Sequence, residues 1–303
     1  MWPLGTKHPF GFFWRLQKLD ITNGPSVAIL IREGKDPLIK VAAVSYFNAR
    51  PLVEGLRGQP DLEVLDLPPA AAAQALLDGE ADVGLVPCVT LLRDPTLTYL
   101  PGLCIGADGM VDSVLLYLRK GALESSNKPL KIALDPHSRT SQMLTRIYLE
   151  RVLGEQRDRV EFSQCSPREL LANPTAAALY DGILVIGDLA LKQVPQGEWE
   201  CVDLAKAWLD ETGLPFVFAV WGLRRETLDA HPELTARFRQ ALDVGMSEID
   251  NIVKDMAAGF GLKADQAKFY LTERIVFHLS ERAEQGLNEF LNRCREWERS
   301  SDA

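Results

Sequence analysis

Four short apolar segments, each leading into a loop or a helix, constrain the fold of this chain more than any other feature. They occupy residues 40–44, 82–86, 131–134 and 181–186. Apolar runs of this length, bounded by polar and turn residues, are typical of buried strands, whereas the segments between them have the spacing of amphipathic helices. Alternating strands and helices predict α/β layers built on mostly parallel sheets.

The pattern occurs once in each half of the chain. The segments at 40 and 131 begin 131 − 40 = 91 positions apart, and those at 82 and 181 begin 181 − 82 = 99 positions apart. This weak repeat favours two similar lobes, and chance similarity of buried strands is the alternative. Two longer apolar strands, at 113–118 and 217–221, predict two crossings between the lobes. The expected boundaries are an N-terminal extension at 1–37, lobe one at 38–120 plus 221–303, and lobe two at 121–220.

Charge and cysteine content narrow the classes of ligand. A net charge of −9 and a pI near 5.1 argue against nucleic acid or an anionic membrane as the main partner. The 5 cysteines have no C-x-x-C spacing and the 4 histidines no paired-ligand spacing, so we expect reduced thiols, a cytoplasmic location and no metal. The expected partner is a small-molecule substrate, and the oligomeric state stays open.

The first 37 residues carry no recognisable targeting signal. The apolar run at 27–31 is too short for the core of a secretory signal and is not followed by a small-residue cleavage site. The chain also lacks a run of about 18 apolar residues, so we expect no transmembrane helix. A loosely docked extension is the expectation for 1–37, with a mis-assigned start codon as the alternative.

Candidate site residues lie where the predicted strands end. Ligands of open α/β sheets bind beyond the carboxyl ends of the strands, and in two facing lobes these ends meet at a central cleft. The loop after the first strand contains Ser45, Tyr46 and Asn48, next to free N–H groups at a helix start that favour an anion. Helix capping alone is the alternative for Ser45 and Asn48.

The corresponding loop of the second half contains Ser138, Arg139, Thr140 and Ser141. Hydroxyls and unpaired N–H groups at a helix start make a seat for a carboxylate, to which Arg139 would add charge-assisted hydrogen bonds. Capping of the helix by Ser or Thr is the alternative.

Three further residues lie at the same expected edge. Ser113 begins a crossing strand, where it would hold a ligand through its hydroxyl. Asp188 either faces the ligand or caps a helix, and His137 is either a general base or a solvated surface histidine. The chain contains no G-x-G-x-x-G, P-loop or G-x-S-x-G motif, which disfavours hydride transfer, phosphoryl transfer and serine-hydrolase chemistry.

Several of these segments occur as motifs in a fixed order along the chain, and the most distinctive motif is TGLPFVFAVW at 212–221. Together they resemble the chorismate dehydratase family, which opens the futalosine route to menaquinone, over about residues 40 to 297. His137 replaces a small polar residue expected before Ser138, which argues against a catalytic role for it. The other matching segments are VSYFNARPL at 44–52, DVGLVP at 82–87, DSVLL at 112–116, SRTS at 138–141, IGD at 186–188 and DLAKAW at 203–208.

The resemblance implies an α/β, two-lobed fold similar to type II periplasmic binding proteins, with a central cleft. It also implies loss of water from chorismate to give 3-[(1-carboxyvinyl)oxy]benzoate, with no metal or organic cofactor. No Lys or Glu base is evident in the cleft loops, so in one interpretation the substrate's own enolpyruvyl carboxylate accepts the proton. Asn48 and Ser113 would be catalytic, and the substrate-binding residues would be Ser45, Tyr46, Ser138, Arg139, Thr140, Ser141 and Asp188.

Two alternatives share the expected fold. A solute-binding protein for a small carboxylate should carry a signal peptide or a lipoprotein cysteine near its start, and neither is visible. The related dihydroxynaphthoate-forming lyase should have a Cys/Pro-rich first loop and a catalytic histidine.

Overall fold

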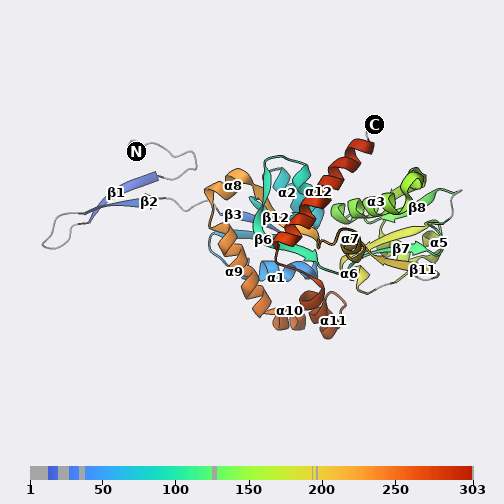
Figure 1. The fold of residues 1–303 in the computed structure, drawn as a ribbon. Helices are drawn as coiled ribbons and strands as arrows, with labels where there is room; N and C mark the ends of the chain where they lie inside the picture. The colour runs from blue at the N-terminus through green and yellow to red at the C-terminus, as the bar shows by residue number, and fades with distance from the viewer. Residues whose placement is uncertain are drawn as a thin grey trace.

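The computed structural model describes residues 13–19, 27–33, 38–124, 128–192, 194–195 and 197–301. Within the expected extension, Phe13–Leu19 (β1) and Val27–Glu33 (β2) pair as an antiparallel hairpin, and the rest of 1–37 lies outside the described residues. The main body consists of two five-stranded sheets flanked by helices, which form two lobes (Figure 1). No helix in the described part of the chain is both long and apolar enough to cross a membrane.

The first lobe is built on a sheet with the order β4-β3-β5-β12-β6. Its middle strand β5 is buried at every position, as expected for a strand covered by helices on both faces. The helix α2 begins at Pro69, where a missing backbone N–H costs nothing. The elements are Ile39–Val44 (β3), Arg50–Val53 (α1), Leu62–Leu67 (β4), Pro69–Leu77 (α2), Val83–Pro87 (β5), Leu97–Ala107 (β6) and Phe216–Arg224 (β12).

The second lobe is built on a sheet with the order β11-β7-β10-β8-β9. Its longest helix, α3, begins after Ser138, whose side chain accepts a hydrogen bond from the Ser141 backbone N–H. The strands are Val114–Arg119 (β7), Leu130–Leu134 (β8), Val160–Gln164 (β9), Gly182–Ile186 (β10) and Trp199–Asp203 (β11). The helices are Arg139–Leu153 (α3), Pro167–Ala172 (α4), Pro174–Ala177 (α5), Gly187–Ala190 (α6) and Leu204–Thr212 (α7).

The two sheets repeat one topology. Read from one edge, β4-β3-β5-β12-β6 and β9-β8-β10-β7-β11 have the same directions: three parallel strands, then one reversed strand, then a fifth that runs with the first three. The two-lobed α/β fold is therefore confirmed, and each sheet is mixed, because four of its strands run in one direction and a single strand runs against them. The reason is that the fourth strand of each sheet arrives from the other lobe and enters against the direction of the first three.

The chain crosses between the lobes after Ala107 and again after Thr212. Strand β7, expected in lobe one, belongs to the second sheet, and β12 belongs to the first sheet from Phe216 onward. Both expected boundaries are therefore corrected to the loops that precede these strands. After the second crossing, helices return to the first lobe: Arg225–Ala230 (α8), Leu234–Ser247 (α9), Ile249–Met256 (α10), Ala264–Phe269 (α11) and Glu281–Ser301 (α12).

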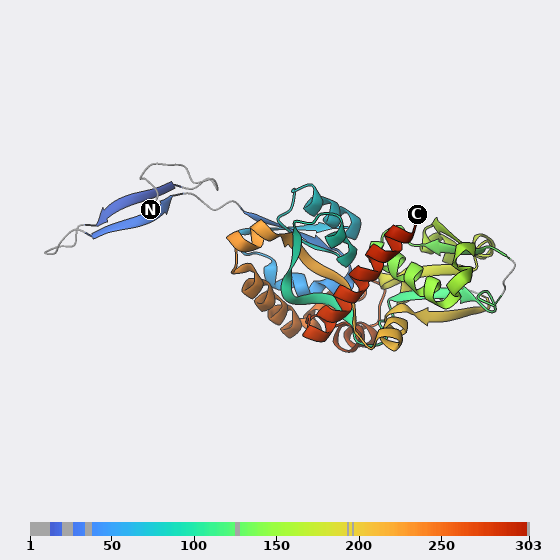
Figure 2. The same ribbon diagram turned by 45° about the horizontal axis from the view of Figure 1, so that its top comes forward.

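The last helix, α12, fastens the two lobes to each other. Figures 1 and 2 show it running from the first lobe toward the second. Its Gly286 allows close packing on the second crossing, because a Cβ atom there would lie 2.1 Å from the carbonyl oxygen of Pro215. Its Phe290 packs edge-on against Trp208 of α7, with ring centroids 5.8 Å apart. The crossing segments are therefore held in a fixed position next to the cleft.

Candidate active site

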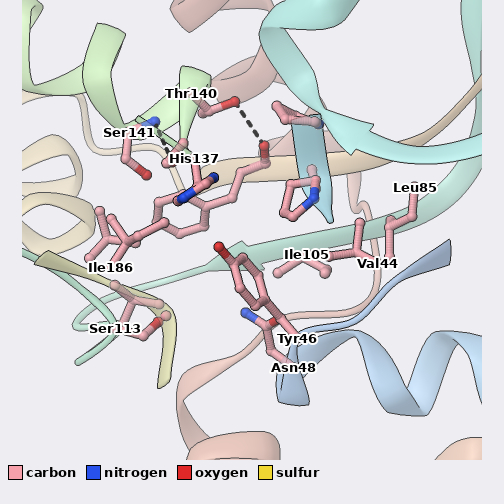
Figure 3. A pocket seen from close by; sticks show the side chains of 18 of the residues that line it. Val44, Tyr46, Asn48, Leu85, Ile105, Ser113, His137, Thr140, Ser141 and Ile186 are labelled. Carbon is pink, nitrogen blue, oxygen red and sulfur yellow. Dashed lines mark hydrogen bonds between the residues drawn. The ribbon is translucent and has the colours of Figure 1, made fainter. Parts of the chain in front are cut away.

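A pocket lies between the lobes, at the ends of strands β3, β5 and β10. It contains about 660 Å³ of space free of protein atoms, its open mouth included. Figure 3 shows side chains entering it from both lobes. Its walls are formed by Val44, Tyr46, Asn48, Pro69, Leu85, Pro87, Ile105, Val111, Ser113, Val114, His137, Ser138, Thr140, Ser141, Ile186, Gly187, Phe218, Ala219 and Ile275.

The first lobe contributes Tyr46 and Asn48 from the loop after β3. Phe47, between them, is fully buried and packs against Phe260, with ring centroids 5.4 Å apart, so its neighbours face the pocket. The Tyr46 hydroxyl points into the pocket (Figure 3). Burial, with a further contribution from the nearby Asp135, raises the pKa of Tyr46 to about 12, so its hydroxyl remains a neutral donor at physiological pH.

The second lobe contributes the start of α3. The hydroxyl of Thr140 donates to the carbonyl oxygen of Phe218 in β12, at 3.1 Å, and is therefore engaged within the protein. The hydroxyl of Ser141 faces the pocket (Figure 3). Together with the N-terminal end of this fifteen-residue helix, it offers a favourable position for a negative group.

The crossing segment before β7 is held by a buried carboxylate. Asp203 accepts hydrogen bonds from the backbone N–H groups of Val111 and Asp112, at 2.9 and 2.8 Å, and also caps α7. Burial raises the pKa of Asp203. Asp112 has a φ of 59°, unfavourable for a side chain with a Cβ, and its carboxylate accepts from Arg274 Nε at 2.5 Å. These contacts place the next residue, Ser113, at the pocket wall.

Tyr270, which sequence reasoning missed, connects two of the candidate residues. The Asn48 amide nitrogen donates to the Tyr270 hydroxyl at 3.1 Å, and this hydroxyl donates to Ser113 Oγ at 2.8 Å. Tyr270 itself is buried and does not line the pocket. It lies 222 positions from Asn48, and a tyrosine among apolar helical positions is no signal of a site.

The oxygen end of the Asn48 amide has no hydrogen-bond partner in the part of the chain that the structure describes. This oxygen, Oδ1, is buried, although Asn48 lines the pocket. A buried acceptor left unpaired costs roughly 1–3 kcal/mol. A ligand that donates a hydrogen bond there would remove this cost.

Three candidate residues do not line the pocket. Ser45 turns toward the neighbouring strand, where its hydroxyl donates to the Leu67 carbonyl oxygen at 3.3 Å. Arg139 lies in a separate groove beside Arg93, because adjacent helical residues point in different directions. Asp188 accepts a hydrogen bond from the Phe47 backbone N–H, and burial raises its pKa to about 6. All three residues therefore lie outside the pocket wall, although each lies within two positions of a residue that lines it.

The electrostatics of the pocket depend on short-range donors. Among the lining residues of the described part of the chain, only His137 can carry a positive charge, and it is exposed. The backbone N–H of His137 donates to Asp135 at 2.8 Å, and burial raises the pKa of this carboxyl group. No cluster of three or more His, Cys, Asp or Glu side chains placed to hold a metal occurs among the described residues.

Comparisons with known proteins agree with this architecture. The model of a family described as "Menaquinone biosynthesis" matches residues 39–296. A chorismate dehydratase of Thermus thermophilus is 32% identical over 263 residues, which cover 81% of this chain and 91% of that protein.

Solved structures extend the comparison at the level of the fold. A protein of Archaeoglobus fulgidus has a TM-score of 0.68 at 15% identity, covering 86% of this chain and 97% of that one. The periplasmic aliphatic sulphonate binding protein of Escherichia coli has a TM-score of 0.59 at 13% identity, covering 86% and 88%. The fold is thus that of periplasmic binding proteins. By its family model and its sequence identity, the chain belongs to the chorismate dehydratase family of menaquinone biosynthesis.

Proposed function

We propose that this protein is a carbon–oxygen lyase that converts chorismate to 3-[(1-carboxyvinyl)oxy]benzoate and water. The observation that carries the proposal is the pocket between the lobes, in a chain 32% identical to a chorismate dehydratase over most of its length. All five cysteines are free thiols, which fits our proposal that it acts in the cytoplasm.

The reaction needs little chemistry from the protein. The substrate loses a proton from the ring carbon that bears the ether and a hydroxide from the neighbouring carbon, and the ring becomes aromatic. Aromatisation supplies the driving force, so the protein has to bind the dianion, orient it and exclude water. In this proposal the enolpyruvyl carboxylate of chorismate accepts the proton, which leaves with the hydroxide as water.

Each polar wall of the pocket then has a role. The start of α3, with the Ser141 hydroxyl, would hold one carboxylate through short-range donors. Asn48 and Ser113, joined through Tyr270, would contact the departing hydroxyl. The apolar lining, such as Leu85 and Ile105, would strengthen these hydrogen bonds by keeping water away.

A solute-binding role is the second candidate, because the fold is shared with periplasmic binding proteins. Incubation of the purified protein with chorismate, followed by chromatography and mass spectrometry, separates the two. A dehydratase forms an aromatic product lighter by one water, in the presence of a chelator as in its absence. A binding protein retains chorismate unchanged, and that result would overturn the proposed reaction.

A further inference from the structure

The hydrogen-bonded chain through Tyr270 has a fixed direction. The Asn48 amide donates to the Tyr270 hydroxyl, so the oxygen of that hydroxyl is an acceptor and its proton goes to Ser113 Oγ. Each hydroxyl has a single proton to donate. Ser113 Oγ therefore accepts from within the protein, and its own proton is available to the pocket that it lines.

The same chain determines the orientation of Asn48. Its nitrogen is held by Tyr270, so its oxygen takes the opposite position, buried and without a partner in the described part of the chain. The pocket wall thus presents an acceptor at Asn48 and a donor at Ser113. A ligand hydroxyl, which donates one hydrogen bond and accepts others, matches this pair.

We infer that Tyr270 is a positioning residue that sets Asn48 as acceptor and Ser113 as donor for the departing hydroxyl of the substrate; this rests on the proposed function. Donation from Ser113 stabilises the negative charge that develops on the leaving oxygen. Three features make Tyr270 suited to the role: it is fully buried, it begins a π-helical turn (Tyr270–Arg274), and it is fixed between two separate segments of the chain. Such turns are frequent at functional sites.

The test is Tyr270→Phe, which removes the hydroxyl and keeps the ring. With chorismate, we expect kcat to fall at least tenfold. The product lacks the ring hydroxyl, so its dissociation constant, measured by calorimetry, should change less than about threefold. A merely structural role would weaken product binding and turnover together and would contradict the inference, as would wild-type kcat in the variant.

Tyr117→Phe is the matched control. Tyr117 is also a buried tyrosine, and its hydroxyl is hydrogen-bonded to Cys201 in β11, away from the pocket. Its kcat should equal that of the wild type. A tenfold loss of kcat in Tyr117→Phe as well would show that removing any buried tyrosine hydroxyl lowers kcat, and this result would overturn the inference.

A crystal structure of Tyr270→Phe separates this inference from the proposed function. If wild-type protein leaves chorismate unchanged, the proposed reaction fails, yet the orientation of Asn48 and Ser113 in the variant still tests the positioning. We expect at least one of the two side chains to rotate. Unchanged rotamers of both side chains would overturn the inference.

Should Tyr270→Phe not fold, Asn48→Asp is the second variant. A carboxylate at this position accepts a hydrogen bond from the Tyr270 hydroxyl, which reverses the direction of the hydrogen-bonded chain. A wild-type kcat in Asn48→Asp would also overturn the inference.

Discussion

The Thr140 hydroxyl, at the start of α3 in the second lobe, donates to the Phe218 carbonyl oxygen in strand β12 of the first lobe, at 3.1 Å. Cys88 of the first lobe contributes to the same junction, since its Sγ lies 3.7 Å from Thr140 Oγ1. Thr140, expected to hold the substrate, therefore joins the two lobes at the pocket wall, and the two neighbouring hydroxyls of α3 have different roles.

Removing the two hydroxyls separately should distinguish these roles. Thr140→Val should lower the free energy of unfolding by about 1 kcal/mol, the value of one internal hydrogen bond, with little change in product affinity. Ser141→Ala should weaken product binding by about tenfold or more, because a hydrogen bond to a charged group is worth roughly 1.5–3 kcal/mol. Calorimetry and chemical denaturation on the same samples check both. Weaker product binding by Thr140→Val, with unchanged product binding by Ser141→Ala, would refute the role given to Ser141.

Asn48→Ala should lower kcat for chorismate more than tenfold, equivalent to about 1.4 kcal/mol of lost transition-state stabilisation. Loss of the side chain removes both the acceptor in the pocket and the donor to Tyr270. Asn292→Ala is the control, because that residue is exposed on α12. Steady-state kinetics on folded proteins provide the measurement, and a wild-type kcat for Asn48→Ala would return the residue to a structural role.

Asp188 should make stability depend on pH. Burial raises its pKa to about 6, above the value of about 3.9 in the unfolded chain. The folded state thus binds the proton more tightly, so this stabilising contribution is complete below pH of about 4 and is lost as the pH rises through about 6. We expect the wild type to lose on the order of 1–3 kcal/mol over this range.

Asp188→Asn should make the profile shallower, because the neutral amide does not titrate. Asp135 and Asp203, whose pKa values are also raised by burial, contribute with the same sign and should leave a residual slope. Urea denaturation at a series of pH values measures the free energy of unfolding. An equally steep profile in Asp188→Asn would show that the raised pKa of Asp188 does not control it.

The sequence predicted the parts of the fold that depend on local pattern. The apolar segments at 40–44, 82–86, 131–134 and 181–186 match strands β3, β5, β8 and β10 to within one residue at each end, because polar and turn residues bound each run. Strand β6, Leu97–Ala107, was missed because its apolar run is interrupted by Pro101 and Gly102. The directions of β7 and β12 follow from where the chain crosses between lobes, which residue spacing does not specify.

The sequence located the loops that line the pocket, but not which of their side chains enter it. Tyr46 and Asn48 face the pocket and Ser45 does not, although all three belong to one loop. Such orientation depends on which neighbour is buried, here Phe47. Tyr270 was beyond reach because only the folded chain brings it to Asn48 and Ser113.

The proposed reaction is tested most directly by comparing product formation from chorismate by the wild type and by a double variant, Asn48→Ala with Ser113→Ala. Both proteins are purified identically and checked for folding by circular dichroism, and the aromatic product is quantified by chromatography. We expect the wild type to convert chorismate fully to the dehydrated product and the double variant to form it at least a hundredfold more slowly. No product from the wild type, or equal rates from the two proteins, would contradict this expectation.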